Sequence, residues 1–247
     1  MSGHSKWATI RRKKEKLDAA RGRVFSGLIK EITIAARMGG GDPNGNPRLR
    51  TAIETAKAAN MPASNIDRAI KKGTGDLPGV TYEEITYEAY GPGGTALLIE
   101  VFTDNRNRTL SEIRHLLGKN GANLAETGSV GWMFNRQALV TVPADEVDEN
   151  EMLTVGLDAG ADDISLEDDF FQISAAPEKL DDIRRAVEEA GFKVDSCEVV
   201  KVPQTEVMVE GTHARQLLRL MEMLEEHDDV QKVWSNFDIP EEMLEDG

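Results

Sequence analysis

The chain of 247 residues has little cysteine and few histidines. Its single cysteine, Cys197, cannot form a disulfide within the chain, and a zinc site built from several cysteines is excluded. The four histidines are scattered, and none stands at a metal-ligand spacing from a cysteine or a carboxylate. We therefore predict neither a metal nor a cofactor. A strand-like run surrounds Cys197, which favours a small buried thiol over a nucleophile.

Long apolar runs are also absent. No stretch approaches the roughly 18 to 20 apolar residues that a membrane span needs, so we expect no membrane partner. The residues before Trp7 do not contain the apolar core of a secretory signal. We expect a mature protein that is localised in a bacterial-type cytoplasm.

Patterns for catalysis are missing as well. The glycine-rich segments 39–41 and 71–75 do not fit G-x-x-x-x-G-K-[ST] between a strand and a helix, which argues against a nucleoside triphosphate site. There is no G-x-S-x-G motif. Acid pairs such as Asp228-Asp229 are typical of solvated turns rather than of paired catalytic carboxylates. We predict that the chain is not an enzyme.

The charges, in contrast, are abundant and unevenly distributed. The residues up to Lys72 include 16 basic and 6 acidic side chains, whereas the rest of the chain includes 13 basic and 38 acidic ones. A basic segment joined to an acidic body is typical of a protein that binds a polyanion, and nucleic acid is the most common polyanion in a cell. The alternative is a solvated basic tail that has no specific partner.

The basic part has the pattern of a helical domain. Residues 8–73 are predicted to be helical, and the first helix has an apolar face formed by Phe25, Leu28, Ile29, Ile32 and Ala36. Asn46 is the expected N-cap of a second helix. Ser64 is expected to cap a third helix, and Gly73 to follow its end.

From about residue 80 the pattern changes to mixed helix and strand. Strands are expected near 85–89 and 96–99, and again at 130–134. Residues 137–201 then follow the order βαββαβ, which is the ferredoxin-like arrangement. The last helix and a strand at 230–234 have no local partners, so we expect them to return to the first sheet.

These patterns predict an α+β fold with three domains. An N-terminal all-helical domain precedes two α/β ferredoxin-like domains, one of which is inserted in the other. The expected boundaries are 1–79 for the helical domain, 80–135 plus 203–240 for the split α/β domain, and 136–202 for the inserted one.

The segment 103–109, Thr-Asp-Asn-Arg-Asn-Arg-Thr, lies where a buried strand ends and a helix begins. Free backbone N–H groups and two arginines at such a place can bind a phosphate or a carboxylate. Capping of the helix by Asn107 or Thr109, with solvated arginines, explains the segment equally well.

The helical domain has few aromatic side chains that could stack on bases, apart from Trp7 and Phe25. Its chemistry therefore favours contacts with backbone phosphates over direct recognition of bases. The candidate nucleic-acid-binding residues are all basic: Lys6, Arg11, Arg12, Lys13, Lys14, Lys16, Arg21, Arg23, Arg48, Arg50, Arg68, Lys71, Lys72, Arg106 and Arg108.

Several long motifs, in the same order along the chain, resemble the YebC/PmpR family. They are GHSKW at 3–7, GGGDP…NPRLR within 39–50, YEAYGPGG at 87–94, DNRNRT at 104–109 and GSV at 128–130. The resemblance covers essentially the whole chain and implies a helical domain followed by two α/β domains. Members of the family are described as transcriptional regulators that bind promoter DNA. A mitochondrial translational activator of cytochrome oxidase subunit I is related to them, and bacterial relatives are linked to ribosomes stalled on proline-rich stretches.

We therefore predict a non-enzymatic regulator of gene expression that binds DNA through the basic helical domain, with a monomer as the favoured state. One alternative is a ribosome-associated translation factor that contacts ribosomal RNA and relieves stalling on proline-rich stretches. Another is an acidic adaptor that binds a protein.

Overall fold

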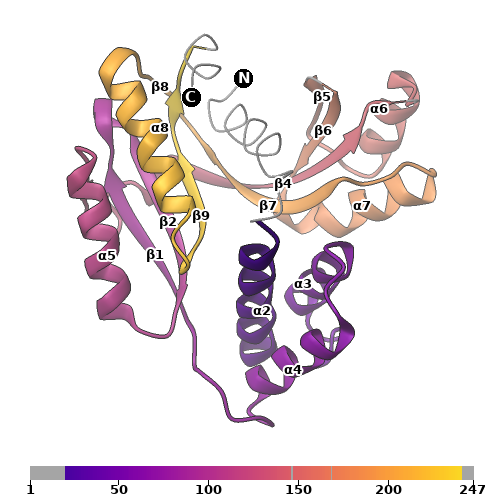
Figure 1. The fold of residues 1–247 in the computed structure, drawn as a ribbon. Helices are drawn as coiled ribbons and strands as arrows, with labels where there is room; N and C mark the ends of the chain where they lie inside the picture. Colours follow the sequence, from indigo (N-terminus) through magenta and orange to yellow (C-terminus); the bar gives the residue numbers. More distant parts are fainter. Residues whose placement is uncertain (1–19, 146, 168, 241–247) are drawn as a thin grey trace. The chain divides into compact units, whose positions relative to one another are not determined.

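The computed structural model describes residues 20–145, 147–167 and 169–240, with side chains from Val24 onward. The fold is α+β with several antiparallel sheets, which confirms the predicted class (Figure 1). By its internal contacts the chain forms two compact units, one of residues 1–132 and 205–247 and the other of Met133–Gln204.

Three helices begin the first unit. They are α2 (Ala20–Gly39), α3 (Pro47–Ala58) and α4 (Ala63–Thr74), and α2 packs against both of the others (Figure 1). The predicted helical residues before Ala20 lie outside the described part. The helices enclose a small apolar core formed by Ile32, Ala35, Ala36, Leu49, Ala52, Ala56, Met61, Ile66 and Ala69. The predicted inner face of the first helix is thus confirmed.

Asn46 caps α3, as predicted. Its side-chain oxygen accepts a hydrogen bond from the backbone N–H of Leu49 at 3.1 Å, which satisfies an otherwise unpaired donor at the helix start. Its Nδ2 donates to the backbone oxygens of Ala35 at 2.8 Å and Gly40 at 2.9 Å. One buried amide therefore ties the start of α3 to the end of α2.

The predicted ends of the third helix were wrong. Helix α4 begins after Pro62 without a side-chain cap, and it ends at Gly75, whose φ of 86° is left-handed. Gly73 lies inside the helix. A Cβ at this position would collide with the backbone oxygen of Thr33 and approach the Cβ of Ala36 at 2.8 Å, so the position requires a glycine. This glycine permits the close contact between α4 and α2, a tertiary role that the sequence pattern does not distinguish from a helix end.

An antiparallel sheet with the strand order β3-β1-β2-β9 follows in the same unit. The elements are β1 (Glu83–Tyr90), η1 (Pro92–Gly94), β2 (Ala96–Thr103), α5 (Arg106–Lys119), β3 (Asn123–Leu124), η2 (Gly131–Met133), α8 (Gly211–Glu225) and β9 (Val230–Ser235). Helices α5 and α8 pack against one face of the sheet (Figure 1). A two-stranded parallel pair, β8 (Val207–Met208) with β10 (Phe237–Asp238), completes the unit.

The pairing of β9 with β2 confirms that the end of the chain returns to the first sheet. The predicted strand at 130–134 was wrong for most of its length, because Gly131–Met133 is a 3-10 turn and β4 begins only at Phe134. The buried carboxylate of Glu88 accepts hydrogen bonds from the N–H groups of Gly128, Val130 and Gly131 at 2.7, 2.6 and 2.9 Å. Amide groups that converge on one carboxylate cannot also donate to a neighbouring strand.

The second unit has the predicted βαββαβ order. Its elements are β4 (Phe134–Pro143), α6 (Glu149–Asp158), β5 (Asp163–Glu167), β6 (Phe170–Ala175), η3 (Pro177–Lys179), α7 (Leu180–Glu189) and β7 (Ser196–Pro203). The strand order is β5-β6-β4-β7, and all neighbours are antiparallel. Side chains such as Val140, Ile173 and Ile183 fill the core between the sheet and its helices, and Cys197 lies half-buried against it.

Replacement of Gly73 by alanine tests the close contact of α4 with α2. We expect Gly73→Ala to lower the free energy of unfolding by about 1–3 kcal/mol, the usual cost of overpacking, in urea denaturation. Gly118, inside α5, has no atom within 4 Å of a built Cβ, so Gly118→Ala should stabilise the protein by up to about 1 kcal/mol. If both alanine variants changed the free energy of unfolding by the same small amount, helix propensity alone would explain both, and the close contact of Gly73 would be contradicted.

Candidate nucleic-acid interface

The structure allows part of the predicted basic set to be placed. Lys6, Arg11, Arg12, Lys13, Lys14 and Lys16 lie outside the described residues, and Arg21 and Arg23 belong to the first turn of α2, where only the backbone is described. Of the remainder, two residues lie on α3 (Arg48, Arg50), three on α4 (Arg68, Lys71, Lys72) and two on α5 (Arg106, Arg108). Their partners divide them into two groups.

Arg48 belongs to the group that is held by carboxylates. Its Nε and Nη2 donate to the two oxygens of Glu31 at 2.7 and 3.1 Å, and its Nη1 donates to Oε2 of Glu84 at 2.8 Å. The guanidinium carbon also lies 6.0 Å from the centre of the Phe102 ring. The hydrogen bonds that Arg48 donates to Glu31 raise the pKa of Arg48 above its usual range. The side chain therefore links helices α2 and α3 to β1, and its charge is compensated within the protein.

Arg108 is held in the same way by Asp229, at the beginning of β9. Its Nη2 lies 2.6 Å from Oδ2 of Asp229 and 3.0 Å from Oδ1 of Asp104. The hydroxyl of Thr109 donates to the same Oδ2 at 2.7 Å. Lys30 of α2 approaches the other oxygen, Oδ1, at 3.0 Å. Two cations and a hydroxyl thus converge on one buried carboxylate.

The environment of Asp229 corrects the prediction that the acid pair at 228–229 forms a solvated turn. Asp229 is only 5% exposed. Burial alone would raise its pKa, but hydrogen bonds from Arg108, Thr109 and Lys30 together hold the pKa of Asp229 well below its usual range. Lys30, which is not in the predicted set, also donates to the backbone oxygen of Asp228 at 2.7 Å. The sequence contains no local signal for this network, since its members come from three distant segments.

The start of α5 is capped by Asn105, a residue that neither of the two expectations for this segment named as the cap. Its side-chain oxygen accepts from the N–H of Arg108 at 3.1 Å, and the hydroxyl of Thr103 accepts from the N–H of Asn105 at 2.9 Å. Because two carboxylates bind Arg108, the segment 103–109 contributes mainly to an ion-pair network within the protein. Arg106 is exposed and has no ion pair within the described part of the chain.

A group of possible metal ligands adjoins this network. Donor atoms of Glu112, His227 and Asp229 lie within 4.8 Å of one another, and Nε2 of His227 is 3.0 Å from Oε2 of Glu112. Both oxygens of Asp229, however, already accept hydrogen bonds from the cations Lys30 and Arg108. Because two positive charges at this distance oppose a third, we assign the group to the ion-pair network rather than to a metal.

The second group consists of Arg37, Arg68, Lys71 and Lys72, which are exposed and lack strong carboxylate partners among the described residues. Arg68 and Lys72 make no ion pair with another described residue, and the same holds for Arg37 at the end of α2. Lys71 has one exposed contact, 3.4 Å to Asp67 on the next helical turn, which is a weak interaction. Arg50 lies on α3 and donates to the backbone oxygen of Pro43 at 3.4 Å. The uncompensated charge of the described helices therefore lies mainly on α4.

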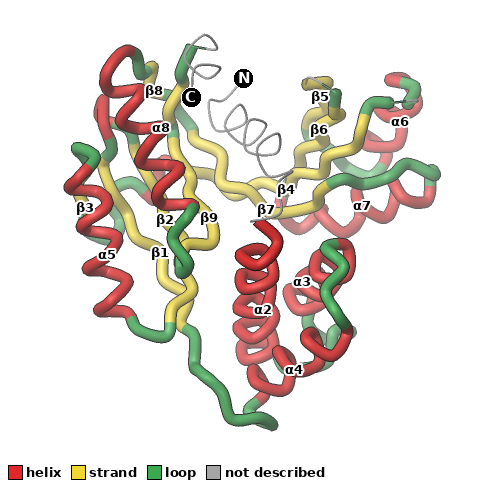
Figure 2. The backbone as a smooth tube through the Cα atoms, in the orientation of Figure 1, coloured by secondary structure: helices red, strands yellow, loops and turns green. Residues whose placement is uncertain are grey.

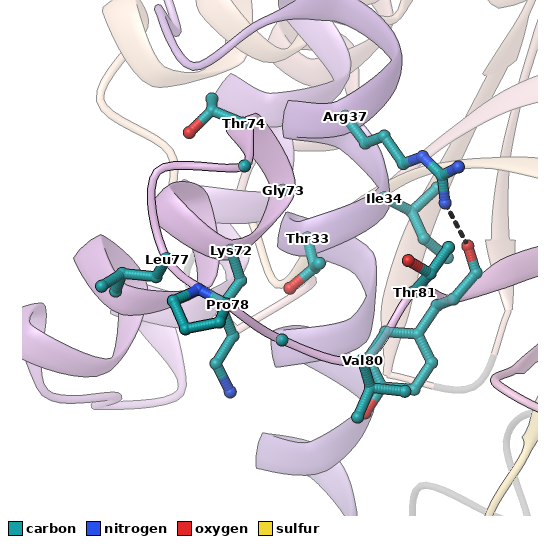
Figure 3. A pocket seen from close by; sticks show the side chains of 13 residues that line it. Thr33, Ile34, Arg37, Lys72, Gly73, Thr74, Leu77, Pro78, Val80 and Thr81 are labelled. Carbon is teal, nitrogen blue, oxygen red and sulfur yellow. Dashed lines mark hydrogen bonds between the residues drawn. The ribbon is translucent and has the colours of Figure 1, made fainter.

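A pocket of about 370 Å³ adjoins this surface (Figure 3). Its lining comes from α2, the end of α4 and the loop 75–82. Figure 2 shows this loop leading from α4 to β1. At its edge, Nη1 of Arg37 donates to the backbone oxygen of Tyr82 at 3.3 Å. The lining combines two cations, three threonines and an apolar wall: Arg37, Lys72, Thr33, Thr74, Thr81, Ile34, Leu77, Pro78 and Val80, together with Tyr82 and three glycines.

Comparison with known proteins identifies the family. The model of the TACO1/YebC protein N-terminal domain matches residues 5–76, and the model of the TACO1/YebC second and third domain matches residues 82–237. The chain belongs to the TACO1/YebC family. A relative from Geobacter sulfurreducens is 54% identical over 245 residues, and one from Desulforapulum autotrophicum is 53% identical over 245 residues, with 99% of each chain covered in both cases. Both are named probable transcriptional regulatory proteins.

A solved structure agrees with this assignment to the TACO1/YebC family. The crystal structure of a conserved hypothetical protein from Aquifex aeolicus is 46% identical, has a TM-score of 0.85 and covers 93% of this chain and 95% of its own. The names of the matched relatives describe regulators and not enzymes. None of the helices in the described ranges combines the length and the apolar character required to cross a bilayer.

The carboxylate of Asp229 can be tested directly. Asp229→Asn leaves Lys30 and Arg108 without their common anion, and we expect the free energy of unfolding to fall by about 2–3 kcal/mol, less than for a fully buried pair because Arg108 is half-exposed. Asp104→Asn, which removes only an exposed partner of Arg108, is the control and should leave urea unfolding nearly unchanged. Equal effects of the two substitutions would contradict the central position of Asp229.

The pH dependence of stability gives a second test. Because the pKa of Asp229 is lower in the folded protein than its ordinary value of 3.8, its contribution is complete above about pH 5 and decreases as the pH falls below 4. The stability difference between the wild type and Asp229→Asn should therefore be constant from pH 5 to 7 and shrink towards pH 2. A difference that grows on acidification would show that the carboxylate is not held in its charged form.

Proposed function

We propose that the chain is a non-enzymatic regulator of gene expression that binds DNA through its basic helical domain, residues 1–79. The observation that carries the proposal is the segregation of charge. Residues 1–79 include 16 basic and 7 acidic side chains, whereas Met133–Gln204 includes 6 basic and 18 acidic ones. A polyanion is attracted to the first segment and repelled by the second. The relatives are named probable transcriptional regulatory proteins, which supports a role in the regulation of gene expression.

The geometry of α3 and α4 supports contact with a duplex. The two helices are joined by residues 59–62, and two helices with a turn of this length are typical of helix-turn-helix proteins, in which the second helix enters the major groove. Ser64, Arg68 and Lys71 are exposed on α4 at positions i, i+4 and i+7, so they lie on one face. This face is opposite to the one that packs on α2. Helix α4 is therefore the proposed contact helix.

In this proposal the exposed cations Arg68, Lys71 and Lys72 bind phosphates, together with the basic residues 6–23. Arg48 and Arg108 stabilise the protein instead, because carboxylates already occupy them. The inserted domain, proposed at 136–202, carries the excess of acids and keeps the polyanion to one part of the molecule. The protein would act in the cytoplasm as a monomer.

A second candidate function is a ribosome-associated translation factor that contacts RNA and relieves stalling on proline-rich stretches. The observation that favours it is Asp67, an exposed acid on the outer side of α4 that would oppose tight insertion of this helix into a groove. In addition, the described helices 20–74 contain Phe25 as their single aromatic side chain, so the surface suits phosphates better than bases. An acidic protein-binding adaptor, the third candidate, relies on the charge of the inserted domain alone.

Salt dependence of DNA binding tests the proposal. With about 6 phosphate contacts, log Kd measured by fluorescence anisotropy on a duplex should change with log salt with a slope of magnitude near 5, and Arg68→Gln or Lys71→Gln should each reduce that slope by roughly 1. Lys193→Gln, an exposed site in the acidic unit, is the matched control and should not change it. A slope of magnitude near 1 would rule out the helical domain as the main anchor.

Sedimentation of a cell lysate on a sucrose gradient separates the two leading functions. A promoter-binding regulator stays near the top and binds its site at least about a thousandfold more tightly than random DNA. A translation factor travels with ribosomes, and a chain without residues 1–23 does not. If the full chain sediments with ribosomes and binds DNA without sequence preference, the translation factor becomes the favoured function and the promoter-binding regulator is rejected.

A further inference from the structure

The pocket beside α4 differs from the other basic sites in its charge balance. Lys30, Arg48 and Arg108 each contact at least one carboxylate within 3.0 Å. Arg37 and Lys72, which line the pocket, contact no carboxylate among the described residues, and no acidic side chain is part of the lining. The pocket therefore presents two uncompensated positive charges to a ligand, and a ligand with a negative group is favoured.

Part of the lining beside these cations is apolar. Ile34 is buried at its base, while Leu77 and Val80 are 37% and 51% exposed along the loop 75–82. Figure 3 shows Leu77 and Pro78 beside Lys72, Val80 and Thr81 further along the loop, and Arg37 on α2 near Thr81. The volume of about 370 Å³ lies within the range of small-ligand sites, which commonly combine an apolar wall with a few polar groups.

The loop that forms this wall is fixed at both ends by hydrogen bonds. At its start, Gly75 adopts a left-handed φ of 86°, and the N–H of Leu77 donates to the backbone oxygen of Lys71 at 3.0 Å. At its end, Arg37 donates to Tyr82. Between them, a Cβ on Gly79 would lie 3.1 Å from Cγ of Lys72, so the glycine allows the lysine stem to run along the loop. These contacts keep the two cations and the apolar residues together in the lining of one pocket.

We propose that this pocket accepts one unpaired nucleotide of a bound nucleic acid. The phosphate would be bound by the lining cations Lys72 and Arg37, and the base and sugar would lie against Leu77, Pro78 and Val80. A base inside a duplex is stacked and cannot enter a pocket, whereas a nucleotide in a bulge or loop can be turned outward. The inference rests on the proposed function and deepens it, since it names the structure in the nucleic acid that the helical domain distinguishes from a regular duplex.

The experiment compares two labelled DNA duplexes of the same sequence, one fully paired and one with a single unpaired nucleotide, by fluorescence anisotropy with the full chain. We expect the wild type to bind the bulged duplex about tenfold more tightly, in the range of one base contact. The double variant Leu77→Ser/Val80→Ser removes the apolar wall without changing the charge, and it should abolish that preference. Both residues are partly exposed, and a thermal melt verifies that the variant is folded.

Lys72→Gln and Lys57→Gln form a matched pair of charge variants. Both lysines are exposed on the helical part, but Lys57 lies at the end of α3 and does not line the pocket. Both should weaken binding to the paired duplex similarly, and only Lys72→Gln should lower the preference for the bulge.

Each other outcome has a distinct meaning. Equal binding of the two duplexes by the wild type overturns the pocket assignment and leaves the proposed function intact. A preference that survives in the double serine variant also overturns the assignment. If the wild type binds neither duplex, the proposed DNA-binding function itself fails, and the pocket assignment fails with it.

Discussion

The carboxylate of Asp229 holds three distant segments of the first unit together. Lys30 reaches it from α2, Arg108 and Thr109 reach it from the first turn of α5, and Asp229 itself precedes β9. Its backbone oxygen accepts from the N–H of Phe102 at 2.8 Å, which joins the same point to the end of β2. A buried charge is stable only where opposite charges and hydrogen bonds replace the lost water, so these segments must meet at this place.

This constraint also decides which basic side chains remain accessible to a polyanion. Arg48 and Arg108 look like phosphate ligands in the sequence, yet carboxylates of the same unit occupy both. Arg68 and Lys72 are exposed and make no ion pair with another described residue. Arg48 and Arg108 are thus bound by carboxylates of the protein, whereas Arg68, Lys72 and Arg37 are exposed and contact no carboxylate among the described residues.

Much of the fold follows from local patterns. The cap at Asn46 and the apolar face of α2 were predictable, because both depend on residues that are close in the chain. The βαββαβ order of the second unit was predictable for the same reason. The errors arose where a distant group intervenes. Gly73 is a glycine because Thr33 of α2 lies against it and not because the helix ends there, and Glu88 of β1 accepts hydrogen bonds from the N–H groups around the turn 131–133.

The candidate site shows the same division. Sequence reasoning located the basic segment and most of its exposed residues, since charge is a property of composition. It did not anticipate Lys30, Asp229 or the pocket that Arg37 lines, because each is formed by segments that are distant in the sequence.

The sequence by itself determined the fold class, the insertion of one α/β domain in the other and the segregation of charge. These features depend on hydrophobic period, on turn residues and on composition, all of which are local or additive. Only the tertiary structure decided which cations are free, because that depends on which carboxylate each one meets. The distance between two charges is set by the packing of helices and strands, and the order of residues along the chain does not specify it.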